Sequence, residues 1–538
     1  MQQRIVENSS FVSVFPLGNG LRVVEQYELQ PKLLLLDHGG TFLRQFGSSL
    51  ACPVVVGTYN EYVALRISCI ESDEILLFHV TDHDDVLVTR IAIPRRTISL
   101  GVIGNRNAKP SVVTYLDNCL YFSEGDAFDA NFVIPQLFHV AHAGIVFDAE
   151  VFITGENEYG APFLERYGLG GVKFGRLALP AGCVQTVPTA DQQFVGAFAS
   201  NGGHIDAILI IDSAGKILRK TEIAPAWLIG SRVVNGLATF VLSRKARRIH
   251  LLVGSDMCIQ TTNFAPLEVL STRVLVASND MPLQGEAREE VFEKPDGTNL
   301  HVVSRHPEIA NGVVVISLHG GPYAASLLDM HSQLSSAILE DGSMVLEPNL
   351  AGSVGYGDDH LIALDIEYLR QGIISDIHFL VNKMRRRGTK KIILMGESFG
   401  AYLAAKAGLV LGSSIISGIV LINGFFDPQS EVELDPQTEI LMRRFFSRSE
   451  PDGGLPSSGS LIPLINLNSA SILIIYSERD DRVAPSQSLE FHQKALMAGV
   501  STSVVMVREA THKDWGVDGI TKRNQAIVAF IRAVSVEQ

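Results

Sequence analysis

Short apolar runs separated by polar turns fill the first 280 residues of the chain. Each run has the length of a β-strand and ends at a cluster rich in Gly, Asn, Asp or Ser; examples are "LRVVEQYEL", "PVVVGTY", "HIDAILIID" and "RIHLLVG". The pattern predicts no long amphipathic helix in this region. Many short strands at even spacing are typical of a sandwich, a barrel or a propeller.

A weak repeat favours the propeller among these three. Segments that start near Val54, Val112 and Phe194 share one order: an extended run, a turn, a second run, then an apolar strand followed by charges. Divided by a propeller repeat of roughly 40 residues, the region gives about six or seven blades. We therefore predict an N-terminal all-β propeller over residues 1–280.

From about Glu289 the pattern changes to apolar strands that alternate with segments of helical spacing. The predicted strands are "GVVVISLHGG", "SMVLEPN", "KKIILMGES", "ISGIVLING", "ASILIIYSE" and "TSVVMVRE". The chain closes on a predicted helix, "TKRNQAIVAFIRAVSV". Strands that alternate with helices predict a doubly wound, mostly parallel sheet, which we assign to residues 281–538.

Charge and cysteine content narrow the partners and the compartment. The chain has 58 acidic and 44 basic residues, so a nucleic-acid partner, which needs clustered Lys and Arg, is not expected. Five scattered cysteines without a C-x-x-C pair fit a reducing compartment. The N-terminus lacks a basic stretch followed by an apolar core, and Gly and Ser interrupt the uncharged segment 409–426. We expect a cytoplasmic protein without a membrane partner.

A serine between two glycines, in "ILMGESFGAYLAA", carries the clearest chemical signal. The motif G-x-S-x-G follows an apolar strand and precedes a helix-like segment, which is the setting of a nucleophile elbow. Side chains beside the serine would collide in so sharp a turn, and Gly396 and Gly400 relieve the crowding. We therefore predict that Ser398 is a nucleophile at the C-terminal edge of the sheet.

Ser398 needs a base and an orienting carboxylate, which follow in the order Asp or Glu, then His, in hydrolases with this elbow. The histidines after Ser398 are His492, in a helical segment, and His512, in a loop directly after a strand. We predict His512 as the base. Asp480 also follows a buried strand, and we predict that it orients His512. Because side chains alternate in direction, only one of Asp480 and Asp481 is expected to point at the imidazole.

Acyl transfer also needs hydrogen-bond donors for the developing oxyanion. The backbone N–H of Phe399, the residue after the nucleophile, is one candidate. The segment "SLHGGPYAAS", 317–326, follows the first long apolar strand, and its glycines allow the backbone to approach a ligand closely. We assign the N–H of Gly321 as the second donor.

Six segments together resemble the prolyl oligopeptidase family of serine peptidases. They are "EVFEKPDGTNL", "LHGGPYAAS", "EPNLAGSVGYGDDH", "GESFGAYLA", "ERDDRVAPSQS" and "THKDW". They occur in the family's order, with 82 positions from Ser398 to Asp480 and 32 from Asp480 to His512, spacings typical of the family. The resemblance implies a β-propeller followed by an α/β-hydrolase domain, and the length is closest to compact acylaminoacyl-peptidase-like or dipeptidyl-peptidase-like members.

The resemblance also implies the roles of individual residues. Ser398, Asp480 and His512 fall on the catalytic triad, and Gly321 and Phe399 fall on the oxyanion donors. The match therefore implies the same site as the residue types and their order predict.

Candidates for substrate binding are less sharply defined. Arg482 matches an arginine that binds a substrate carbonyl or terminus, and a surface ion pair with Asp481 or Glu478 is the alternative. Four phenylalanines either line an apolar pocket for the acyl side of the substrate or belong to the hydrophobic core: Phe425, Phe426, Phe445 and Phe446.

The sequence departs from the family's pattern at several positions. Ala351 stands where the family has an arginine, "RQGI" at 370–373 replaces a "G-D-W-G"-like segment, and Ala401 replaces a glycine. These departures indicate a specialised member with an unusual substrate or supporting network. Glu397, beside the nucleophile, is either a salt-bridged structural residue, which we favour, or a ligand of a substrate amine.

The leading hypothesis is a serine peptidase or amidase that needs no metal or cofactor. The propeller would restrict entry to short peptides or small amides. An esterase, or a biosynthetic acyltransferase or cyclase with the same triad, is the first alternative, and a non-catalytic propeller scaffold is the second. A homo-oligomer stays open.

Overall fold

The chain divides into two compact units, residues 1–281 and 282–538. The computed structural model describes residues 3–4, 11–17, 21–27, 31–37, 42–46, 54–68, 73–93, 98–103, 110–116, 119–123, 130–133, 139–140, 145–147, 150–157, 161–168, 172–189, 191, 193–200, 203–234, 237–254, 259–262, 266–270, 273–276, 286–328, 332–434, 459–513 and 515–536.

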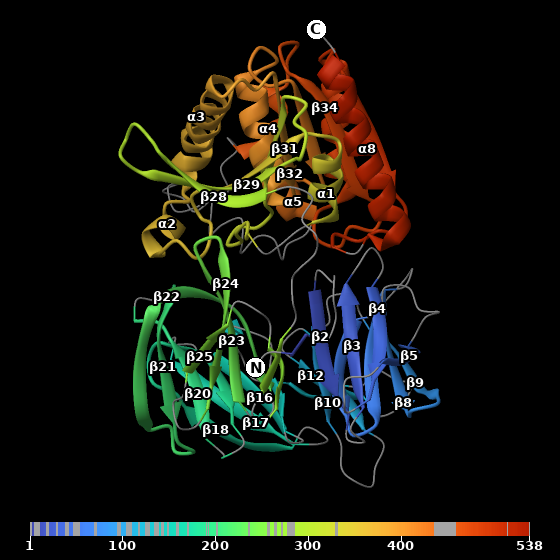
Figure 1. Cartoon of the computed structure of the whole chain (residues 1–538), viewed down its shortest axis with the longest axis vertical. Coiled ribbons are helices and arrows are strands. Elements are labelled where there is room, and N and C mark those ends of the chain that lie inside the picture. The colour runs from blue at the N-terminus through green and yellow to red at the C-terminus, as the bar shows by residue number, and fades with distance from the viewer. Residues whose placement is uncertain are drawn as a thin grey trace. The chain divides into compact units, whose positions relative to one another are not determined.

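The described part of the first unit consists of β-sheets whose strands follow one another along the chain (Figure 1). Three sheets have four antiparallel strands each. They are β2 (Phe11–Pro16), β3 (Arg22–Tyr27), β4 (Pro31–Leu36) and β5 (Phe42–Phe46); β6 (Val54–Tyr59), β7 (Tyr62–Ser68), β8 (Asp73–Val80) and β9 (Asp85–Ile93); and β10 (Ile98–Ile103), β11 (Ser111–Leu116), β12 (Cys119–Ser123) and β13 (Ala130–Val133).

Three further sheets complete the described part of this unit. The first two contain β14 (His139–Val140), β15 (Ile145–Phe147), β16 (Glu150–Glu156), β17 (Pro162–Tyr167) and β18 (Lys173–Ala178); and β19 (Cys183–Pro188), β20 (Phe194–Phe198), β21 (Ile205–Ile211), β22 (Ile217–Val234), β23 (Leu237–Arg244), β24 (Arg247–Val253) and β25 (Ile259–Thr262). The third contains β26 (Pro266–Leu270), β27 (Arg273–Val276) and β1 (Gln3–Arg4). In this last sheet β1, from the start of the chain, pairs in parallel with β27.

Neighbouring sheets of the first unit pack face to face through their apolar side chains. Val23 and Leu35 of one sheet share a buried cluster with Val63, Leu65 and Leu76 of the next. Strands with side chains buried on both faces contain continuous apolar runs, as β21 does with "AILII" at 207–211. The predicted all-β character of this region is confirmed in the residues that the structure describes.

The second unit is built on one eight-stranded sheet, in the order β28-β29-β31-β30-β32-β33-β34-β35. β29 pairs antiparallel with β28 and with β31, and every other pair is parallel. The strands are β28 (Glu286–Glu293), β29 (Asn299–His306), β30 (Val313–Leu318), β31 (Met344–Asn349), β32 (Lys391–Glu397), β33 (Gly418–Ile422), β34 (Ser471–Ser477) and β35 (Thr502–Val507).

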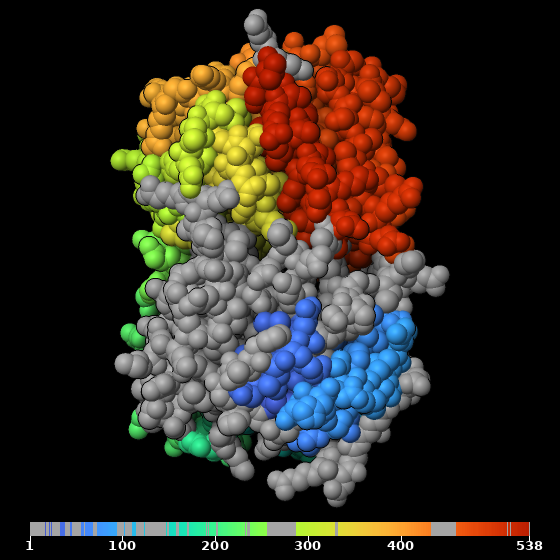
Figure 2. All heavy atoms as spheres, turned by 45° about the vertical axis from the view of Figure 1, so that its right-hand side comes forward, coloured from blue at the N-terminus to red at the C-terminus, as the bar shows by residue number. Residues whose placement is uncertain are grey.

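Helices cover both faces of this sheet (Figure 1). One buried cluster joins the sheet to α3, α4 and α7, and a second joins it to α1 and α8. Figure 2 shows α8 on the surface of the unit beside α1. The helical elements are α1 (Gln333–Glu340), α2 (Asp358–Ile362), η2 (Tyr368–Gly372), α3 (Ile373–Arg386), α4 (Phe399–Leu411), α5 (Pro428–Leu434), η4 (Ile462–Leu464), α7 (Pro485–Met497) and α8 (Gly516–Val536). The predicted doubly wound, mostly parallel sheet is confirmed.

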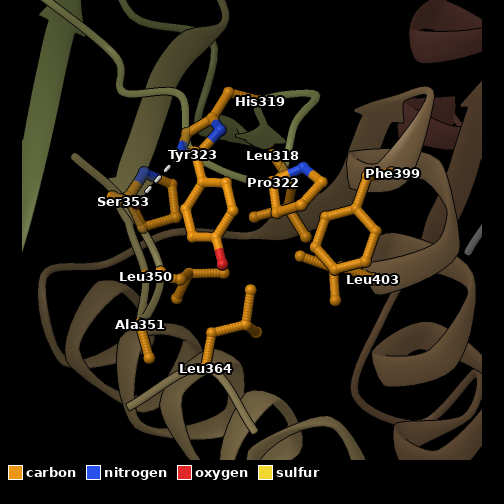
Figure 3. Close-up of a pocket in the computed structure, with 12 residues that line it drawn as sticks. Leu318, His319, Pro322, Tyr323, Leu350, Ala351, Ser353, Leu364, Phe399 and Leu403 are labelled. Carbon is orange, nitrogen blue, oxygen red and sulfur yellow. Dashed lines mark hydrogen bonds between the residues drawn. The ribbon is translucent and has the colours of Figure 1, made fainter. Parts of the chain in front are cut away.

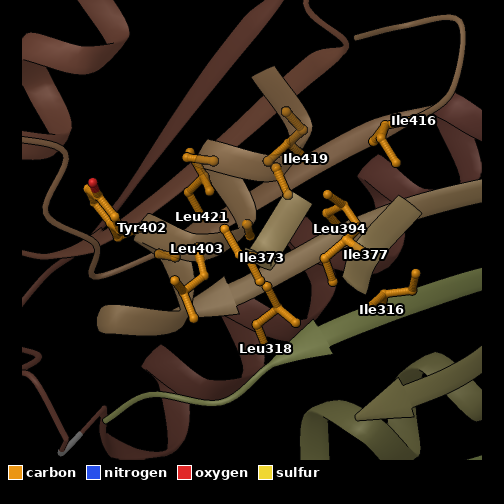
Figure 4. Packing of buried hydrophobic residues seen from close by; sticks show 14 of the residues in the cluster. Ile316, Leu318, Ile373, Ile377, Leu394, Tyr402, Leu403, Ile416, Ile419 and Leu421 are labelled. Atoms are coloured by element: carbon orange, nitrogen blue, oxygen red, sulfur yellow. The ribbon is translucent and has the colours of Figure 1, made fainter. Parts of the chain in front are cut away.

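Side-chain spacing explains how the helices attach to the sheet. In α3 the buried residues Ile373, Ile377 and Leu380 recur every three or four positions, so one stripe faces the strands and the basic end is exposed. Figure 4 shows Ile373 and Ile377 packed with Ile316 and Leu394 of the central strands. By contrast, α4 is almost entirely apolar because it is buried on most sides.

The uncharged segment 409–426 falls into three pieces. It contains the end of α4, a turn that begins at Gly412 with φ +73°, and the fully buried strand β33. None of the helices in the described parts of the chain combines the length and the apolar character that a membrane span requires.

Candidate active site

Ser398, the predicted nucleophile, occupies the turn that joins β32 to α4 (the nucleophile turn). Its φ of 56° and ψ of −122° are values that a residue with a side chain rarely adopts, at a cost of about 1–3 kcal/mol. A Cβ on Gly396 would lie 2.1 Å from the carbonyl oxygen of Gly400, and a Cβ on Gly400 would lie 2.2 Å from the carbonyl oxygen of Leu318. The two glycines therefore let strand, helix and the end of β30 meet around the serine.

Two other predicted residues, distant in sequence, form a hydrogen-bond chain with this serine. The Nε2 atom of His512 is 3.0 Å from the Oγ atom of Ser398. The Nδ1 atom of His512 lies 2.8 and 2.9 Å from the two carboxylate oxygens of Asp480. Because the carboxylate accepts a hydrogen bond from Nδ1–H, Nε2 is left to accept the serine proton. The histidine and aspartate side chains are only 8% and 2% exposed.

The loop after β34 fixes the carboxylate of Asp480. Its Oδ1 atom accepts hydrogen bonds from the backbone N–H groups of Arg482 and Val483, each at 2.9 Å. The neighbouring Asp481 instead accepts a 3.3 Å hydrogen bond from the backbone N–H of His512. Adjacent carboxylates thus bind different parts of one histidine, Asp480 its ring and Asp481 its backbone.

Asn423 connects the end of β34 to the backbone of His512, and the sequence did not predict this role. It directly follows β33, has a φ of 46° and is only 1% exposed. Its Nδ2 donates to the hydroxyl of Ser477 at 3.0 Å and to the carbonyl of His512 at 3.3 Å, and its Oδ1 accepts from the N–H of Ser477 at 2.8 Å. The sequence signal for it is a lone amide directly after an all-apolar strand.

The glycine-containing loop after β30 lies against the nucleophile turn. A Cβ on Gly320 would be 3.3 Å from the carbonyl oxygen of Glu397 and 3.5 Å from the Cβ of Ser398. Gly321 follows with a φ of +150° and an exposed backbone. The loop that carries the second predicted donor is therefore adjacent to the serine, and Phe399, the first predicted donor, is the first residue of α4.

The side chain of His319 holds this loop in place through hydrogen bonds. Burial lowers the pKa of His319, so its ring is neutral near pH 7. The neutral ring donates from Nδ1 to the carbonyl of Gly320 at 2.7 Å and accepts at Nε2 from the hydroxyl of Ser353 at 2.9 Å. The neutral imidazole of His319 forms a hydrogen bond at each ring nitrogen and thereby fixes the loop after β30 to the segment around Ser353 (Figure 3).

Two basic side chains, Arg482 and Lys513, lie near His512 in the loop between β35 and α8 (the histidine loop). Arg482 is exposed, and no carboxylate among the described residues, Asp481 and Glu478 included, lies within ion-pair distance of its guanidinium. Burial and the neighbouring Arg482 lower the pKa of Lys513. The structure thus leaves Arg482 available for a substrate carbonyl or carboxylate.

Glu397 faces α8. Its negative charge opposes the burial that lowers the pKa of Arg523, whose guanidinium lies 4.9 Å from the centre of the Trp515 ring. Since Trp515 follows His512 by three positions, these contacts connect the nucleophile turn, the histidine loop and α8. The electrostatic interaction with Arg523 agrees with the structural role favoured for Glu397, which stays a prediction.

The structure corrects the interpretation of Phe425 and Phe426 as pocket residues. Both are buried in the core, at 3% and 1% exposure. The Phe425 ring stacks on Phe399 and Tyr402, and Phe426 packs on Phe491 of α7 with ring centroids 4.2 Å apart. The physical reason is that the chain stays inside the buried core after β33, so that Phe425 and Phe426, which follow the strand after two intervening residues, pack in the same hydrophobic cluster as the strand. Two other predicted pocket residues lie outside the described residues: Phe445 and Phe446.

An elbow serine, a histidine and a buried aspartate at the C-terminal ends of β32, β35 and β34 define the class of α/β-hydrolases. Residues 330–535 match the family model described as the prolyl oligopeptidase family. The second unit therefore matches the prolyl oligopeptidase family, which the motifs predicted, and the predicted enzyme class, a serine hydrolase, is confirmed with it.

Solved structures share the fold of the whole chain. Acylaminoacyl peptidase from Pyrococcus horikoshii aligns with a TM-score of 0.69 at 13% identity, over 98% of this chain and 97% of that chain. A puromycin-hydrolyzing peptidase from Mycobacterium tuberculosis aligns with a TM-score of 0.58 at 13% identity, over 98% and 95%. Dipeptidyl peptidase 4 from Porphyromonas gingivalis aligns with a TM-score of 0.58 at 10% identity, over 98% of each. The search of curated proteins found no match.

Proposed function

We propose that the chain is a serine peptidase or amidase that cleaves short peptides or small peptide-like amides. The observation that carries this proposal is the hydrogen-bond chain from the Oγ atom of Ser398 through His512 to Asp480. A hydroxyl is a weak nucleophile until a base takes its proton, and this chain places the base at 3.0 Å.

In the first step His512 accepts the proton of Ser398 while the Oγ atom attacks the substrate carbonyl. Asp480 stabilises the imidazolium that forms. The carbonyl oxygen becomes an oxyanion, and we assign its donors as the N–H groups of Phe399 and Gly321. Phe399 lies at the N-terminus of α4, where the helix dipole also favours negative charge.

The intermediate collapses when His512 gives its proton to the leaving amine, which leaves an acyl group on Ser398. A water molecule then repeats the sequence: His512 takes a proton from the water, the hydroxide attacks the acyl carbon, and the proton returns to the Oγ atom of Ser398. The proposed chemistry uses only these side chains, the two N–H groups and water.

We further propose that the first unit is a β-propeller that limits which substrates reach the site. Two observations support the propeller. The parallel pairing of β1 with β27 joins the start of the unit to its last sheet. In addition, residues 217–226 of β22 pair with β21, and residues 227–234 pair with β23, so this strand serves two successive four-stranded sets. Counted so, the described sheets form seven sets of strands, and we propose that each set is one blade, within the expected range of six or seven.

A fluorophosphonate probe tests the nucleophile directly. Wild type is expected to be labelled on Ser398, whereas Ser398→Ala is expected to remain unlabelled. Ser414→Ala, at an exposed turn position, is the matched control and should label like wild type. A folded wild type that the probe does not label would favour the non-catalytic scaffold instead.

A substrate library identifies the bond that is cleaved. Wild type and Ser398→Ala are incubated with short peptides, N-acylated peptides, puromycin and simple esters, and the products are read by mass spectrometry. The last three are chosen because two fold neighbours are called an acylaminoacyl peptidase and a puromycin-hydrolyzing peptidase, and because an esterase is the alternative. Turnover of esters alone, or transfer to an added amine in preference to water, would overturn the peptidase proposal.

A further inference from the structure

The three residues of the proposed triad lie on loops that follow three different strands, and the site requires these loops to keep their relative positions. Ser398 follows β32, Asp480 follows β34 and His512 follows β35. β33 lies between β32 and β34, and only β34 separates it from β35. Because neighbouring strands lie about 4.8 Å apart, the end of β33 is within reach of all three loops.

Two adjacent residues at the end of β33 contact the first two loops. The carbonyl oxygen of Ile422, the last residue of the strand, accepts a 2.8 Å hydrogen bond from the backbone N–H of Ser398. The next residue is Asn423, whose side-chain oxygen accepts from the N–H of Ser477 at 2.8 Å. The carbonyl oxygen of Ser477 in turn accepts from the N–H of Asp480 at 3.3 Å. β33 is therefore bonded to the nucleophile turn directly and to the Asp480 loop through Ser477.

The side-chain amide of Asn423 also reaches the histidine loop. Its Nδ2 atom donates to the carbonyl oxygen of His512 at 3.3 Å and to the hydroxyl of Ser477 at 3.0 Å. Asn423 and Ser477 are 1% and 0% exposed, so bulk water does not compete for these hydrogen bonds. A single amide thus joins the main chain of the proposed base to the two other loops.

The chemistry of position 423 favours asparagine. The carbonyl oxygen of His512 needs a donor and the N–H of Ser477 needs an acceptor, and an amide side chain supplies both. The backbone at 423 has a φ of 46°, which Asn, Asp and Gly adopt more readily than other residues. Of these three, only asparagine carries both a donor and an acceptor when it is not protonated.

We propose that Asn423 is a positioning residue for catalysis, which fixes the main chain of His512 relative to Asp480 and Ser398. The inference rests on the proposed function, because it takes these three residues as the triad. Asn423 acts through the backbone of the histidine and not on the reacting atoms. The Nε2 atom of His512 is 3.0 Å from the Oγ atom of Ser398, so a shift of the main chain lengthens the path of the proton. A displacement of about 1 Å can slow a reaction about 100-fold.

The rate of fluorophosphonate labelling, measured at increasing probe concentration, tests this role. The measurement yields the fraction of protein labelled at completion, the half-saturating probe concentration and the limiting rate constant. Asn423→Gly removes the side chain and suits the positive φ, and it should lower the limiting rate constant about 10–100-fold. The half-saturating concentration and the labelled fraction should stay near wild type, since the folded variant still binds the probe.

Asn311→Gly is the matched control. The side chain of Asn311 accepts from the N–H of Val313 at 2.8 Å. It donates to the carbonyl of Asp341 at 2.9 Å and to the hydroxyl of Ser343 at 3.1 Å. This is the same set of bonds, but it lies where β30 begins, at the sheet edge opposite the triad. The control should label at the wild-type rate, and an equal fall in both variants would contradict the positioning role.

Asn423→Asp separates the two contacts of the amide. A carboxylate still accepts from Ser477, but it offers no donor to the carbonyl oxygen of His512, so the limiting rate constant should fall at least as far as in Asn423→Gly. This variant decides the question if Asn423→Gly does not fold, which thermal unfolding and the labelled fraction would reveal. A folded wild type that the probe does not label contradicts the proposed function. A wild type that is labelled, with the same limiting rate constant in the folded variants at 423, contradicts the positioning role alone.

Discussion

Asp480 and Asp481 are adjacent in the sequence and chemically identical, but their carboxylates have different roles. Asp480 contacts the imidazole of His512 through both oxygens, whereas Asp481 accepts only the backbone N–H of that histidine. The direction of each side chain therefore decides its role.

Replacement of Asp480 by Asn should lower kcat by roughly 10³–10⁴-fold, because an amide no longer holds the imidazole in the tautomer that accepts the serine proton. Asp481→Asn is the matched control, and its kcat should fall far less. Steady-state kinetics on the best amide substrate measure both variants. Equal losses in the two would contradict the assignment of Asp480.

His319 makes the stability of the protein depend on pH. Its pKa in the folded state is below the usual 6.5 because of burial, so the unfolded chain takes up this proton at a higher pH than the folded chain. The contribution is complete above pH 6.5 and is lost as the pH falls through 6.5 towards the lower pKa of the folded state.

We therefore expect that the denaturation midpoint of wild type falls between pH 7.5 and pH 5.5, and falls less in His319→Gln. Urea titrations at several pH values measure this. His378→Gln, at an exposed position of α3, should show the same change of the denaturation midpoint with pH as wild type. An equal change of the midpoint with pH in all three proteins would show that His319 does not cause the pH dependence of stability.

Single residues were predictable where their chemistry is tied to a position relative to a strand. Ser398, Asp480 and His512 each follow a predicted strand, and parallel strands bring their C-terminal ends to one edge. Phe425 and Phe426 follow a strand as well, but the sequence pattern is the same for an apolar side chain that lines a pocket and for one buried in the core. Only the packing of Phe426 on Phe491 separates the two.

The nucleophile turn depends on close contact between three elements. β32, α4 and the end of β30 meet with no room for a side chain at Gly396 or Gly400. The sequence predicted these glycines from the sharpness of the turn, and the structure adds the backbone of β30 as the neighbour that excludes a Cβ at 400.

Gly400→Ala should destabilise the second unit by about 1–3 kcal/mol, because its methyl group would overlap the carbonyl oxygens of Leu318 and His319. Fluorophosphonate labelling should slow as well, because the loop with the proposed oxyanion donor must shift. Gly175→Ala in β18, where no heavy atom lies within 4 Å of the added Cβ, should leave both quantities near wild type. Thermal unfolding and labelling rates report the result, and unchanged values for Gly400→Ala would refute the close contact.

Element boundaries were less predictable where tertiary contacts override the helical pattern. The segment around 370–373 has helical spacing and is helical, but residues Tyr368–Gly372 form one turn of π-helix that leads directly into α3. A Cβ on Gly372 would lie 2.3 Å from the Tyr368 ring, whose hydroxyl donates to Asp376 at 2.8 Å. Lys294 donates to the same carboxylate at 2.9 Å. This partner lies more than seventy positions earlier in the chain, so the local pattern cannot reveal it.

At the scale of the whole molecule, the change from short strands to alternating strands and helices predicted two kinds of architecture. The number of sheets in the first unit was harder to predict, because the repeats share an order of elements but little sequence. β22 adds to the difficulty, since its 18 residues form one uninterrupted strand that pairs first with β21 and then with β23. A repeat boundary inside a continuous strand has no turn residues to mark it.

The proposed restriction on access makes a prediction about substrate length. A propeller is penetrated by a narrow channel, so a long chain would have to be threaded or partly excluded, whereas a short peptide diffuses in. Intact casein and a peptic digest of the same casein present the same bonds at the same concentration and differ only in chain length. The full-length protein should release new amino groups from the digest and few or none from intact casein, with Ser398→Ala as the blank for both. Comparable rates on the two would mean that the first unit does not limit entry, and would leave the chemistry at Ser398 untouched, since cleavage of either sample still requires that serine.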